Sequence, residues 1–273
     1  MTSPKISVLM SAYNNADYLS QSVNSILNQS FADFELILID DASSDQSLKI
    51  IQDLAFSDSR IKILRNRENL GLTKSLNQGL KIAAGEYIAR QDADDLSRPE
   101  RLAIQCQYLE KHPEIFLCGT SAMLIDEQGE IIGHYLKKNN PEKLEKILKR
   151  HNHLLHSSIM FCNQNIFYRE RFYYAQDYDL YLRLLSDGKK ITNLPQTLIQ
   201  YRYHRDSLSF QNFKKQKKFA RIARKFYNQR LKSYRDEYDF FDPRTILQKR
   251  NKINIPLSPR VRIALAQLQS WRD

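Results

Sequence analysis

The sequence of 273 residues predicts an α/β fold with a Rossmann-like, mostly parallel central sheet, flanking helices and a basic helical C-terminal extension. Two observations predict the sheet. Short apolar runs alternate with segments of helical periodicity, and polar side chains gather directly after those runs. A third observation, the concentration of positive charge beyond residue 209, predicts the extension. Because strands joined through helices form right-handed crossovers, most neighbouring strands should be parallel.

Four apolar runs in the first hundred residues are typical of buried strands. They cover residues 6–10, 34–39, 61–64 and 87–90. Between them, apolar residues recur at helical spacing, as in Leu72, Leu76 and Leu80. Asn14, Asn15 and Ser44 are residue types that cap helices, so we expect the first two helices to begin next to them.

After Pro99 the alternation of strands and helices becomes less regular. We expect helices over residues 99–111 and 178–186, and short strands over residues 116–121, 123–125, 156–161 and 198–203. This second half should build the opposite wall of a cleft whose floor is the carboxyl edge of the first four strands.

Composition excludes several classes of protein. Apolar residues make up 42% and charged residues 27% of the chain, without an apolar run long enough to span a bilayer or to act as a secretory signal. We therefore expect the chain to stay in the cytoplasm. The seven glycines form neither GxGxxG nor a P-loop, and the three cysteines form no CxxC pair. Dinucleotide-dependent oxidoreductases, P-loop enzymes and zinc knuckles are thereby disfavoured.

The net charge of +11 is unevenly distributed. Residues 210–273 hold 17 Lys and Arg against 5 Asp and Glu, whereas residues 1–209 hold 25 against 26. A nucleic-acid-binding protein normally spreads basic groups over its folded domain, and none of the common DNA- or RNA-binding signatures is present. We therefore expect no nucleic-acid partner.

Three carboxylates within four residues mark the strongest candidate site, Asp92-Ala93-Asp94-Asp95. Carboxylates this close repel one another unless positive charge lies nearby. Mn²⁺ and Mg²⁺ prefer oxygen ligands, and Mg²⁺ usually combines one or two carboxylates with substrate phosphates. The run therefore predicts a metal–diphosphate site, although a single Asp-x-Asp also occurs in many solvated loops.

Four ordered motifs resemble family 2 glycosyltransferases of the GT-A fold. They are Ser7–Asn14, Ile39–Asp45, Asn69–Gly71, and Gly85–Ile88 leading to Asp92–Asp95, and the similarity continues to His204. The resemblance implies a GT-A catalytic domain over residues 1–209, with a nucleotide-sugar-binding half at 1–98 and an acceptor half at 99–209. The basic extension at 210–273 lies outside the resemblance.

The resemblance implies an inverting, metal-dependent transfer of a hexose or N-acetylhexosamine from a UDP-sugar. The acceptor would be a saccharide or a lipid-linked oligosaccharide in surface polysaccharide biosynthesis. Asp177 falls at the position of the catalytic base, and Asp94 and His204 at positions that would hold Mn²⁺ or Mg²⁺. The residues implied for donor binding are Ser11, Tyr13, Asn14, Asp40, Asp41, Asn69, Lys74, Asp92 and Ala93.

These roles agree with the chemistry of the side chains. Tyr13 can stack on a base, Asp41 can accept the imide N–H of uracil, and a carboxylate at Asp177 can take the proton of the attacking hydroxyl. Asp177 could instead cap the helix at 178–186. Two departures from the family pattern matter here: Ser11 stands where proline is frequent, and Ala42 where glycine is common. We expect both to be tolerated if the backbone there avoids positive φ.

Two questions stay open at this stage. The segment from Lys214 to Arg235 predicts an amphipathic basic helix, which could lie on an anionic membrane surface or pack its apolar stripe on the catalytic domain. The competing functions are a non-catalytic nucleotide-sugar-binding protein and a nucleotidyltransferase. The second would normally carry a glycine-rich, lysine-bearing phosphate loop near the N-terminus, which is absent.

Overall fold

The computed structural model describes residues 3–136, 140–205 and 207–247. The chain divides into one compact unit of residues 1–241 and a second unit that begins at Asp242. Within the described part of the second unit, α9 (Arg244–Leu247) follows Asp242, whose carboxylate accepts the backbone N–H of Arg244 at 2.9 Å. The helix predicted after Ser258 lies outside the described residues.

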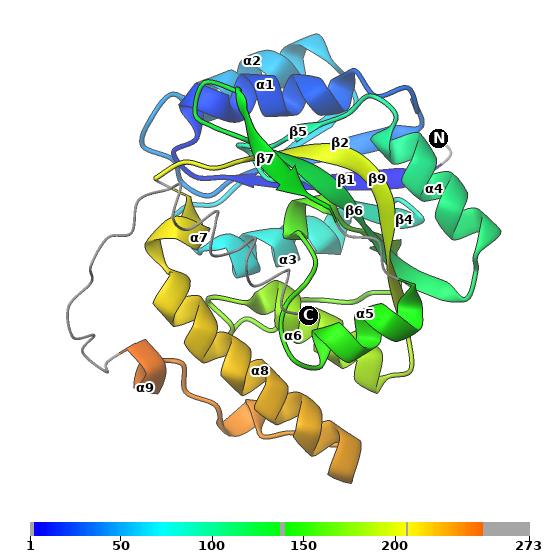
Figure 1. Cartoon of the computed structure of the whole chain (residues 1–273). Helices are drawn as coiled ribbons and strands as arrows, with labels where there is room; N and C mark the ends of the chain where they lie inside the picture. Colours follow the sequence, from blue (N-terminus) through cyan, green and yellow to red (C-terminus); the bar gives the residue numbers. More distant parts are fainter. Residues whose placement is uncertain (1–2, 137–139, 206, 248–273) are drawn as a thin grey trace. The chain divides into compact units, whose positions relative to one another are not determined.

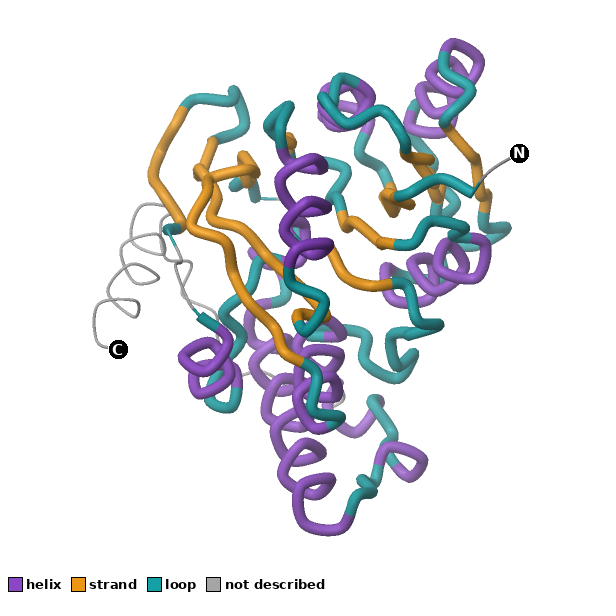
Figure 2. Tube along the Cα trace, turned by 90° about the vertical axis from the view of Figure 1, so that its right-hand side faces the viewer, coloured by secondary structure: helices purple, strands orange, loops and turns teal. Residues whose placement is uncertain are grey.

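The first unit is built on one sheet (Figures 1 and 2). Among the described residues its strands follow the order β3-β2-β1-β4-β8-β6-β9-β5, with β7 added beside β6. The strands are β1 (Ile6–Ala12), β2 (Phe34–Asp40), β3 (Ile61–Arg65), β4 (Tyr87–Arg90), β5 (Leu96–Ser97), β6 (Ile115–Ile125), β7 (Ile131–Tyr135), β8 (Met160–Cys162) and β9 (Lys190–Arg202). The four strands predicted in the first hundred residues are all present.

Helices cover both faces of this sheet. They are α1 (Ala16–Leu27), α2 (Ser47–Ser57), α3 (Leu72–Ile82), α4 (Arg101–Lys111), α5 (Pro141–Leu148), α6 (Gln176–Ser186), α7 (Leu208–Gln211) and α8 (Phe213–Ser233), with 3₁₀ turns η1 (His156–Ser158) and η2 (Tyr238–Phe240). Alternate residues of the central strands serve the two faces: Val8 and Met10 join the core with α1, α2 and α4. Leu9 and Ile37 face α3, whose Gly79 approaches them so closely that a Cβ would lie 3.3 Å from Leu9.

The parallel strands end together and so define the site. Strands β3, β2, β1 and β4 pair in parallel, and the register sets Ala12 beside Asp40 and Asp40 beside Arg65. The loops that follow these strands therefore leave the same edge of the sheet, where ligands of open α/β sheets bind. Most of the sequence-predicted site residues are on these loops.

The second half of the sheet is antiparallel in part, so the sheet as a whole is mixed. Strand β8 pairs antiparallel with both β4 and β6, and β5 pairs antiparallel with β9, whereas β6 and β9 are parallel. The strand predicted over residues 156–161 is shorter than expected, because residues 156–158 form η1 instead. Strand β9 is longer than predicted, since it begins at Lys190.

Helix α8 packs on the first unit through the apolar stripe that the sequence predicted. Phe219, Ala223, Phe226 and Tyr227 are buried, and the rings of Phe219 and Phe226 lie about 6 Å from that of Phe172. The predicted boundary between a catalytic domain and an extension at residue 209/210 stays a prediction, but α8 lies within the compact first unit.

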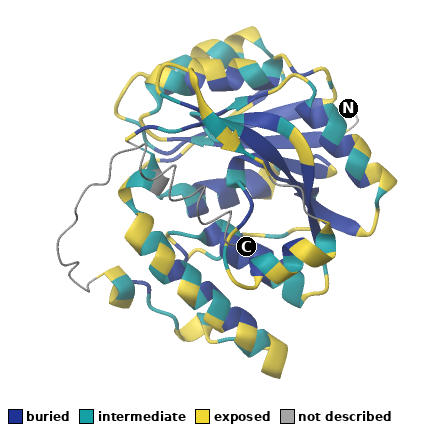
Figure 3. Cartoon of the chain, viewed as in Figure 1, coloured by how far each residue is buried: buried dark blue, intermediate teal, exposed yellow. Residues whose placement is uncertain are grey.

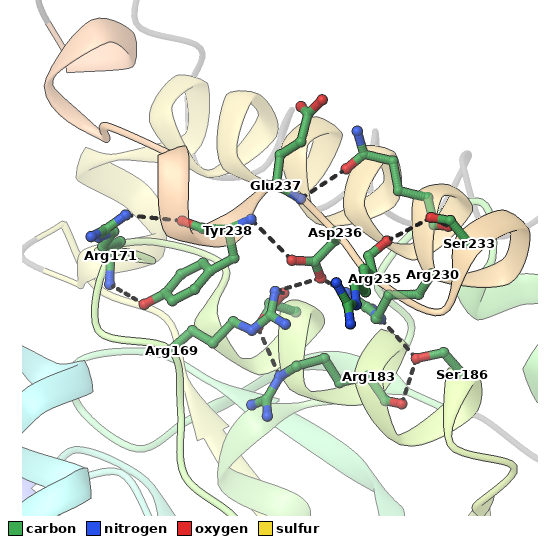
Figure 4. A network of polar contacts seen from close by, with 12 residues as sticks. Arg169, Arg171, Arg183, Ser186, Arg230, Ser233, Arg235, Asp236, Glu237 and Tyr238 are labelled. Carbon is green, nitrogen blue, oxygen red and sulfur yellow. Dashed lines mark hydrogen bonds and ion pairs between the residues drawn. The ribbon is translucent and has the colours of Figure 1, made fainter.

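A charged network also fastens the end of α8 to α6 (Figure 4). The carboxylate of Asp236 accepts hydrogen bonds from Arg169, at 2.8 Å, and from Arg230. Arg230 donates further to Ser186 at the end of α6, and Arg183 on the same helix pairs with buried Asp179 at 3.1 Å. These pairs are largely shielded from water, so they fix α8 and the chain after it against α6.

Local backbone chemistry differs from the sequence prediction at three places. We expected alanine at position 42 to be tolerated if the backbone avoids positive φ, but Ala42 has φ 59°. This left-handed conformation costs a residue with a side chain about 1 kcal/mol. Helix α2 begins at Ser47, and Ser44 does not cap it. Asn15 occupies the N-cap position of α1 without a side-chain capping hydrogen bond.

Candidate active site

The loops after β1 and β2 are joined to each other by side-chain hydrogen bonds. The Asn14 side chain accepts the backbone N–H of Ser44 at 2.8 Å, and the Ser43 hydroxyl accepts the backbone N–H of Asn14 at 3.1 Å. Asn14 has φ 53°, a strained conformation for a residue with a side chain. Tyr13, beside it, is 47% exposed, so part of its side chain is open to solvent. Ser11 is half-buried within β1.

Asp41 is buried and organises the loop that carries Asn69. Its two oxygens accept the Asn66 side-chain amide at 2.7 Å and the backbone N–H groups of Leu70 and Gly71 at 2.9 Å. Gly71 has φ 82° and stands directly before α3, a conformation that suits glycine. Three of the four acceptor positions of the carboxylate are therefore used to shape this loop, which leaves one for a ligand.

The other donor-site candidates lie around this loop. Asp40 ends β2 as a fully buried residue, and its Oδ2 has no hydrogen-bond partner among the described residues. Asn69 is exposed, and Lys74 is half-buried in the first turn of α3. Helix α3 is tied to the other half of the molecule, because Thr73 donates to the backbone carbonyl of Phe172 at 2.8 Å and Asn77 donates to that of Tyr168 at 2.9 Å.

The acidic run after β4 is surrounded by arginine side chains. Arg90, almost fully buried, pairs with Asp92. Arg202 on β9 donates its backbone N–H to Asp95 at 2.8 Å and its Nε–H to the carbonyl of Asp94 at 3.0 Å. Burial, followed by Asp94 and Asp92, raises the pKa of Asp95 well above its ordinary value. Burial also raises the pKa of Asp92, against the opposing effect of Arg90. Ala93 is buried between them.

Arg101 supports this turn from below. Its fully buried guanidinium donates to Gln91 at 2.8 Å, Ser97 at 2.9 Å, Gln105 at 2.9 Å and the carbonyl of Arg90. Burial lowers the pKa of Arg101 to about 9, so the group stays charged at neutral pH. Its hydrogen-bond partners are neutral. The charge of Arg101 therefore attracts the nearby carboxylates of Asp95 and Asp92 through space, without direct ion pairs.

Asp94 and His204 meet as the sequence predicted. Asp94 Oδ2 lies 2.8 Å from His204 Nε2, and the two residues come from segments that are 110 positions apart. The carboxylate is a suitable ligand for Mn²⁺ or Mg²⁺, whereas imidazole is a more typical ligand of softer transition metals. The described residues contain no group of three or more His, Cys, Asp or Glu side chains that could hold a metal. A cation at this pair would therefore need substrate phosphates and water to complete its coordination.

Asp177 lies in the first turn of α6, one residue beyond the start, rather than at the N-cap. The N-cap is Ala175, whose φ of 54° is another strained value next to a candidate site residue. Asn152 donates a hydrogen bond to Asp177 Oδ2 at 2.7 Å. Burial raises the pKa of Asp177, and the neighbouring charge of Asp92 acts in the same direction. The two carboxylates are thus close enough to influence one another.

Several further side chains lie near these two carboxylates. His156 Nε2 lies 2.8 Å from the hydroxyl of Tyr168, and burial together with Arg90 lowers the pKa of His156 so far that its ring is neutral. Tyr181 is also buried near Asp177 and Asp92, and burial raises the pKa of its hydroxyl. The sequence analysis did not single out Arg90, which had a usable signal as a cation two positions before the acidic run. Asn152 and Tyr181 had none.

The comparisons with known proteins agree with this geometry. The family model of Glycosyl transferase family 2 matches residues 7–177, which contain β1, the acidic run and Asp177. The chain belongs to glycosyltransferase family 2. A relative described as a glycosyltransferase, EpsE of Bacillus subtilis strain 168, is 38% identical over 225 residues, which are 77% of each chain.

Two further proteins are informative, one a relative in sequence and one a solved structure. The chain is 30% identical over 222 residues to WfgD of Escherichia coli, a UDP-Glc:alpha-D-GlcNAc-diphosphoundecaprenol beta-1,3-glucosyltransferase, covering 78% of this chain and 83% of WfgD. Residues 1–349 of S. aureus TarS, crystallised with UDP, superpose with a TM-score of 0.63 at 20% identity, covering 80% of this chain and 65% of TarS 1–349. The second likeness shows that the fold is the GT-A fold predicted above.

We expect the buried arginine below the acidic turn to be essential for folding of this family 2 protein. Replacement of Arg101 by Met leaves at least four buried acceptors without their donor and removes the positive charge near Asp92 and Asp95. Arg101→Met should lower the free energy of unfolding by about 3–5 kcal/mol, measured by urea denaturation. Exposed Arg98, three positions earlier, provides the control, and Arg98→Met should change stability by less than about 0.5 kcal/mol. Equal effects of the two substitutions would contradict this role.

Proposed function

We propose that this protein is an inverting glycosyltransferase that transfers a hexose or N-acetylhexosamine from a UDP-sugar to a saccharide or lipid-linked acceptor in polysaccharide biosynthesis. The observation that carries the proposal is the meeting of Asp94 and His204 at 2.8 Å, from segments 110 positions apart, beside the acidic turn after β4. The influence of Asp92 on the pKa of Asp177 supports a place for Asp177 near the same turn. WfgD, whose name states a UDP-glucose donor and a diphosphoundecaprenol-linked acceptor, supports the choice of both substrate classes.

In this proposal the loops after β1 and β2 hold the uridine. The exposed ring of Tyr13 stacks on the base, and the remaining acceptor position of Asp41 receives the imide N–H. Ser11, Asn14, Asp40, Asn69 and Lys74 complete the nucleotide site, and Asp92 with Ala93 contacts the ribose or donor sugar. Asp94 and His204 hold Mn²⁺ or Mg²⁺, which would neutralise charge on the diphosphate.

Asp177 takes the role of general base. A hydroxyl of the acceptor attacks the anomeric carbon from the side opposite to the diphosphate, forming the new glycosidic bond while the bond to the diphosphate breaks. The hydroxyl proton passes to the Asp177 carboxylate, and the bonding electron pair leaves with UDP. A single displacement of this kind inverts the anomeric configuration. Asn152 holds the carboxylate in place through its 2.7 Å hydrogen bond.

The metal–diphosphate site is tested by titrating UDP into the protein with and without Mn²⁺ in a calorimeter. We expect Mn²⁺ to strengthen UDP binding, and Asp94→Ala to reduce this enhancement by at least about 10-fold, because one of two protein ligands is lost. Asp53→Ala, on the exposed side of α2, should behave like the wild type. Absence of heat from UDP in either condition would rule out the proposed donor.

The base assignment predicts a separation of binding from turnover. Asp177→Asn cannot accept the proton, so transfer should fall by about 10²–10⁴-fold while UDP affinity stays the same. Asp187→Asn, at the exposed end of the same helix, should leave both unchanged. Full turnover by Asp177→Asn would exclude it as the base.

The raised pKa of Asp177 predicts the acid limb of the pH–rate profile. The base must be deprotonated to work, so activity is lost as pH falls through its pKa, and burial places this loss above the ordinary aspartate value of about 3.9. Asn152→Ala removes a hydrogen bond that favours the charged carboxylate, so the limb in kcat/KM should move to still higher pH. A limb that stays in place in Asn152→Ala would show that another group titrates.

A further inference from the structure

Helix α8 has an outer face that the contacts with the first unit leave uncovered. Its inner face holds Phe219, Ala223, Phe226 and Tyr227 against the rest of the unit, as described above. At about 100° per residue, the side chains on the opposite side share an arc of roughly 120°. They are Phe213, Lys214, Lys217, Arg221, Lys225, Asn228, Leu231 and Lys232, and we call this set the outer face of α8. Arg224 falls in the same arc but donates to the backbone carbonyl of Arg150 at 2.6 Å, so it is not counted.

The outer face is strongly cationic. Helix α8 contains nine Lys and Arg residues and no Asp or Glu in its 21 positions. A solvated helix of this length normally alternates charges so that partners four positions apart attract, whereas like charges at that spacing repel. Within the part of the chain that the structure describes, we find no acidic partner for Lys214, Lys217, Arg221 or Lys232. Lys225 forms an exposed pair with Glu237 at 2.6 Å, which contributes little.

The cationic side chains also line a shallow surface hollow. Arg221, Arg224, Lys225, Asn228, Gln229 and Lys232 surround a volume of about 490 Å³. Every one of these side chains can donate hydrogen bonds and none is acidic, so the hollow suits an anion such as a phosphate. The helix itself is held rigidly from behind by the Asp236 network, which means that the donors are presented on a fixed support (Figure 4).

Large apolar side chains stand at both ends of the cationic stripe. Phe213 at the start of α8 is 49% exposed, and Leu231 near its end is 56% exposed. Just beyond the helix, Tyr234 and Phe240 are 94% and 88% exposed. Figure 3 shows exposed segments, in yellow, along α8 and at its lower end. Cations combined with exposed aromatic and aliphatic side chains are typical of surfaces that lie at the interface of a lipid bilayer.

We propose that the outer face of α8 docks on an anionic phospholipid surface. The cations approach the phosphate groups, and Phe213 and Leu231 enter the boundary between head groups and acyl chains. Docking through the outer face differs from insertion of the apolar stripe of α8 into the membrane, because that stripe is already buried in the first unit. The described residues contain no helix that could cross a bilayer. The acidic turn and the base belong to other surfaces of the same unit, so docking and donor binding are separable.

The proposal is tested by sedimentation of the full-length protein with vesicles of mixed phosphatidylglycerol and phosphatidylcholine, and with vesicles of phosphatidylcholine alone. Wild-type protein should bind only the mixed vesicles, and added salt should weaken the binding. The combined variant Lys214→Gln, Arg221→Gln, Lys232→Gln should lower the partition coefficient by about 100-fold, since each cation near an anionic surface contributes about 5-fold.

A matched variant removes the same charge elsewhere. The variant Lys49→Gln, Lys111→Gln, Lys190→Gln changes three exposed lysines on α2, α4 and β9. Its partition coefficient on the mixed vesicles should fall only by the amount expected from the lower net charge acting at long range, to within about 2-fold. Both triple variants should keep wild-type affinity for UDP, which distinguishes loss of docking from failure of the donor site. Equal loss of vesicle binding in the two variants would overturn the proposal.

A second comparison separates a membrane from other polyanions. Leu231→Ser removes an exposed apolar side chain without changing charge, so it should weaken binding to the mixed vesicles by about 10-fold. Wild-type protein should bind a double-stranded DNA fragment more weakly than the vesicles, and Leu231→Ser should not alter that binding. Tighter binding to DNA, or vesicle binding that is insensitive to Leu231→Ser, would reject the bilayer as the partner.

Discussion

The acidic turn after β4 is the constraint on which the active-site half of this molecule depends. Three carboxylates within four residues can be buried at the edge of a sheet only if positive charge compensates them. The structure supplies positive charge through Arg90, which pairs with Asp92, and through Arg101, whose buried guanidinium acts on Asp92 and Asp95. Arg202 contributes its backbone N–H, which donates to Asp95. Asp92 and Asp95 are held in this way, whereas the contact of the Asp94 carboxylate that we find among the described residues is with the imidazole of His204.

The strands could be predicted, and the family resemblance recognised, because both depend on patterns of neighbouring residues in the sequence. Apolar runs of the β1, β2 and β4 type are visible along the chain, and the motifs are attached to their ends. Contacts between side chains that are far apart in the sequence could not be predicted in this way. The compensation of the acidic run by arginines, the neutral state of His156 and the approach of Asn152 to Asp177 all arise from tertiary packing. The alternative reading of Asp177 as an N-cap does not hold, because Ala175 adopts a left-handed conformation and α6 starts at Gln176, two residues earlier than predicted.

Helix α6 connects the two surfaces discussed above. Its first turn carries Asp177, and its later turns carry Asp179, Arg183 and Ser186, which meet the network at the end of α8. Strain is concentrated around the same region and around the β1 and β2 loops, at Asn14, Ala42 and Ala175. Backbone strain of this kind persists where the surrounding contacts hold it, and it is often found at functional sites.

One continuous segment, from Gln176 through β9 to His204, supplies both Asp177 and the imidazole beside Asp94. Detachment of this segment from the sheet would remove both groups together. In a transferase of the proposed type, a partly opened molecule would then be inactive, and it would not hydrolyse the nucleotide-sugar. Because one stretch of polypeptide carries both groups, they are in place only when that stretch is folded, and donor hydrolysis by a partly unfolded molecule is thereby prevented.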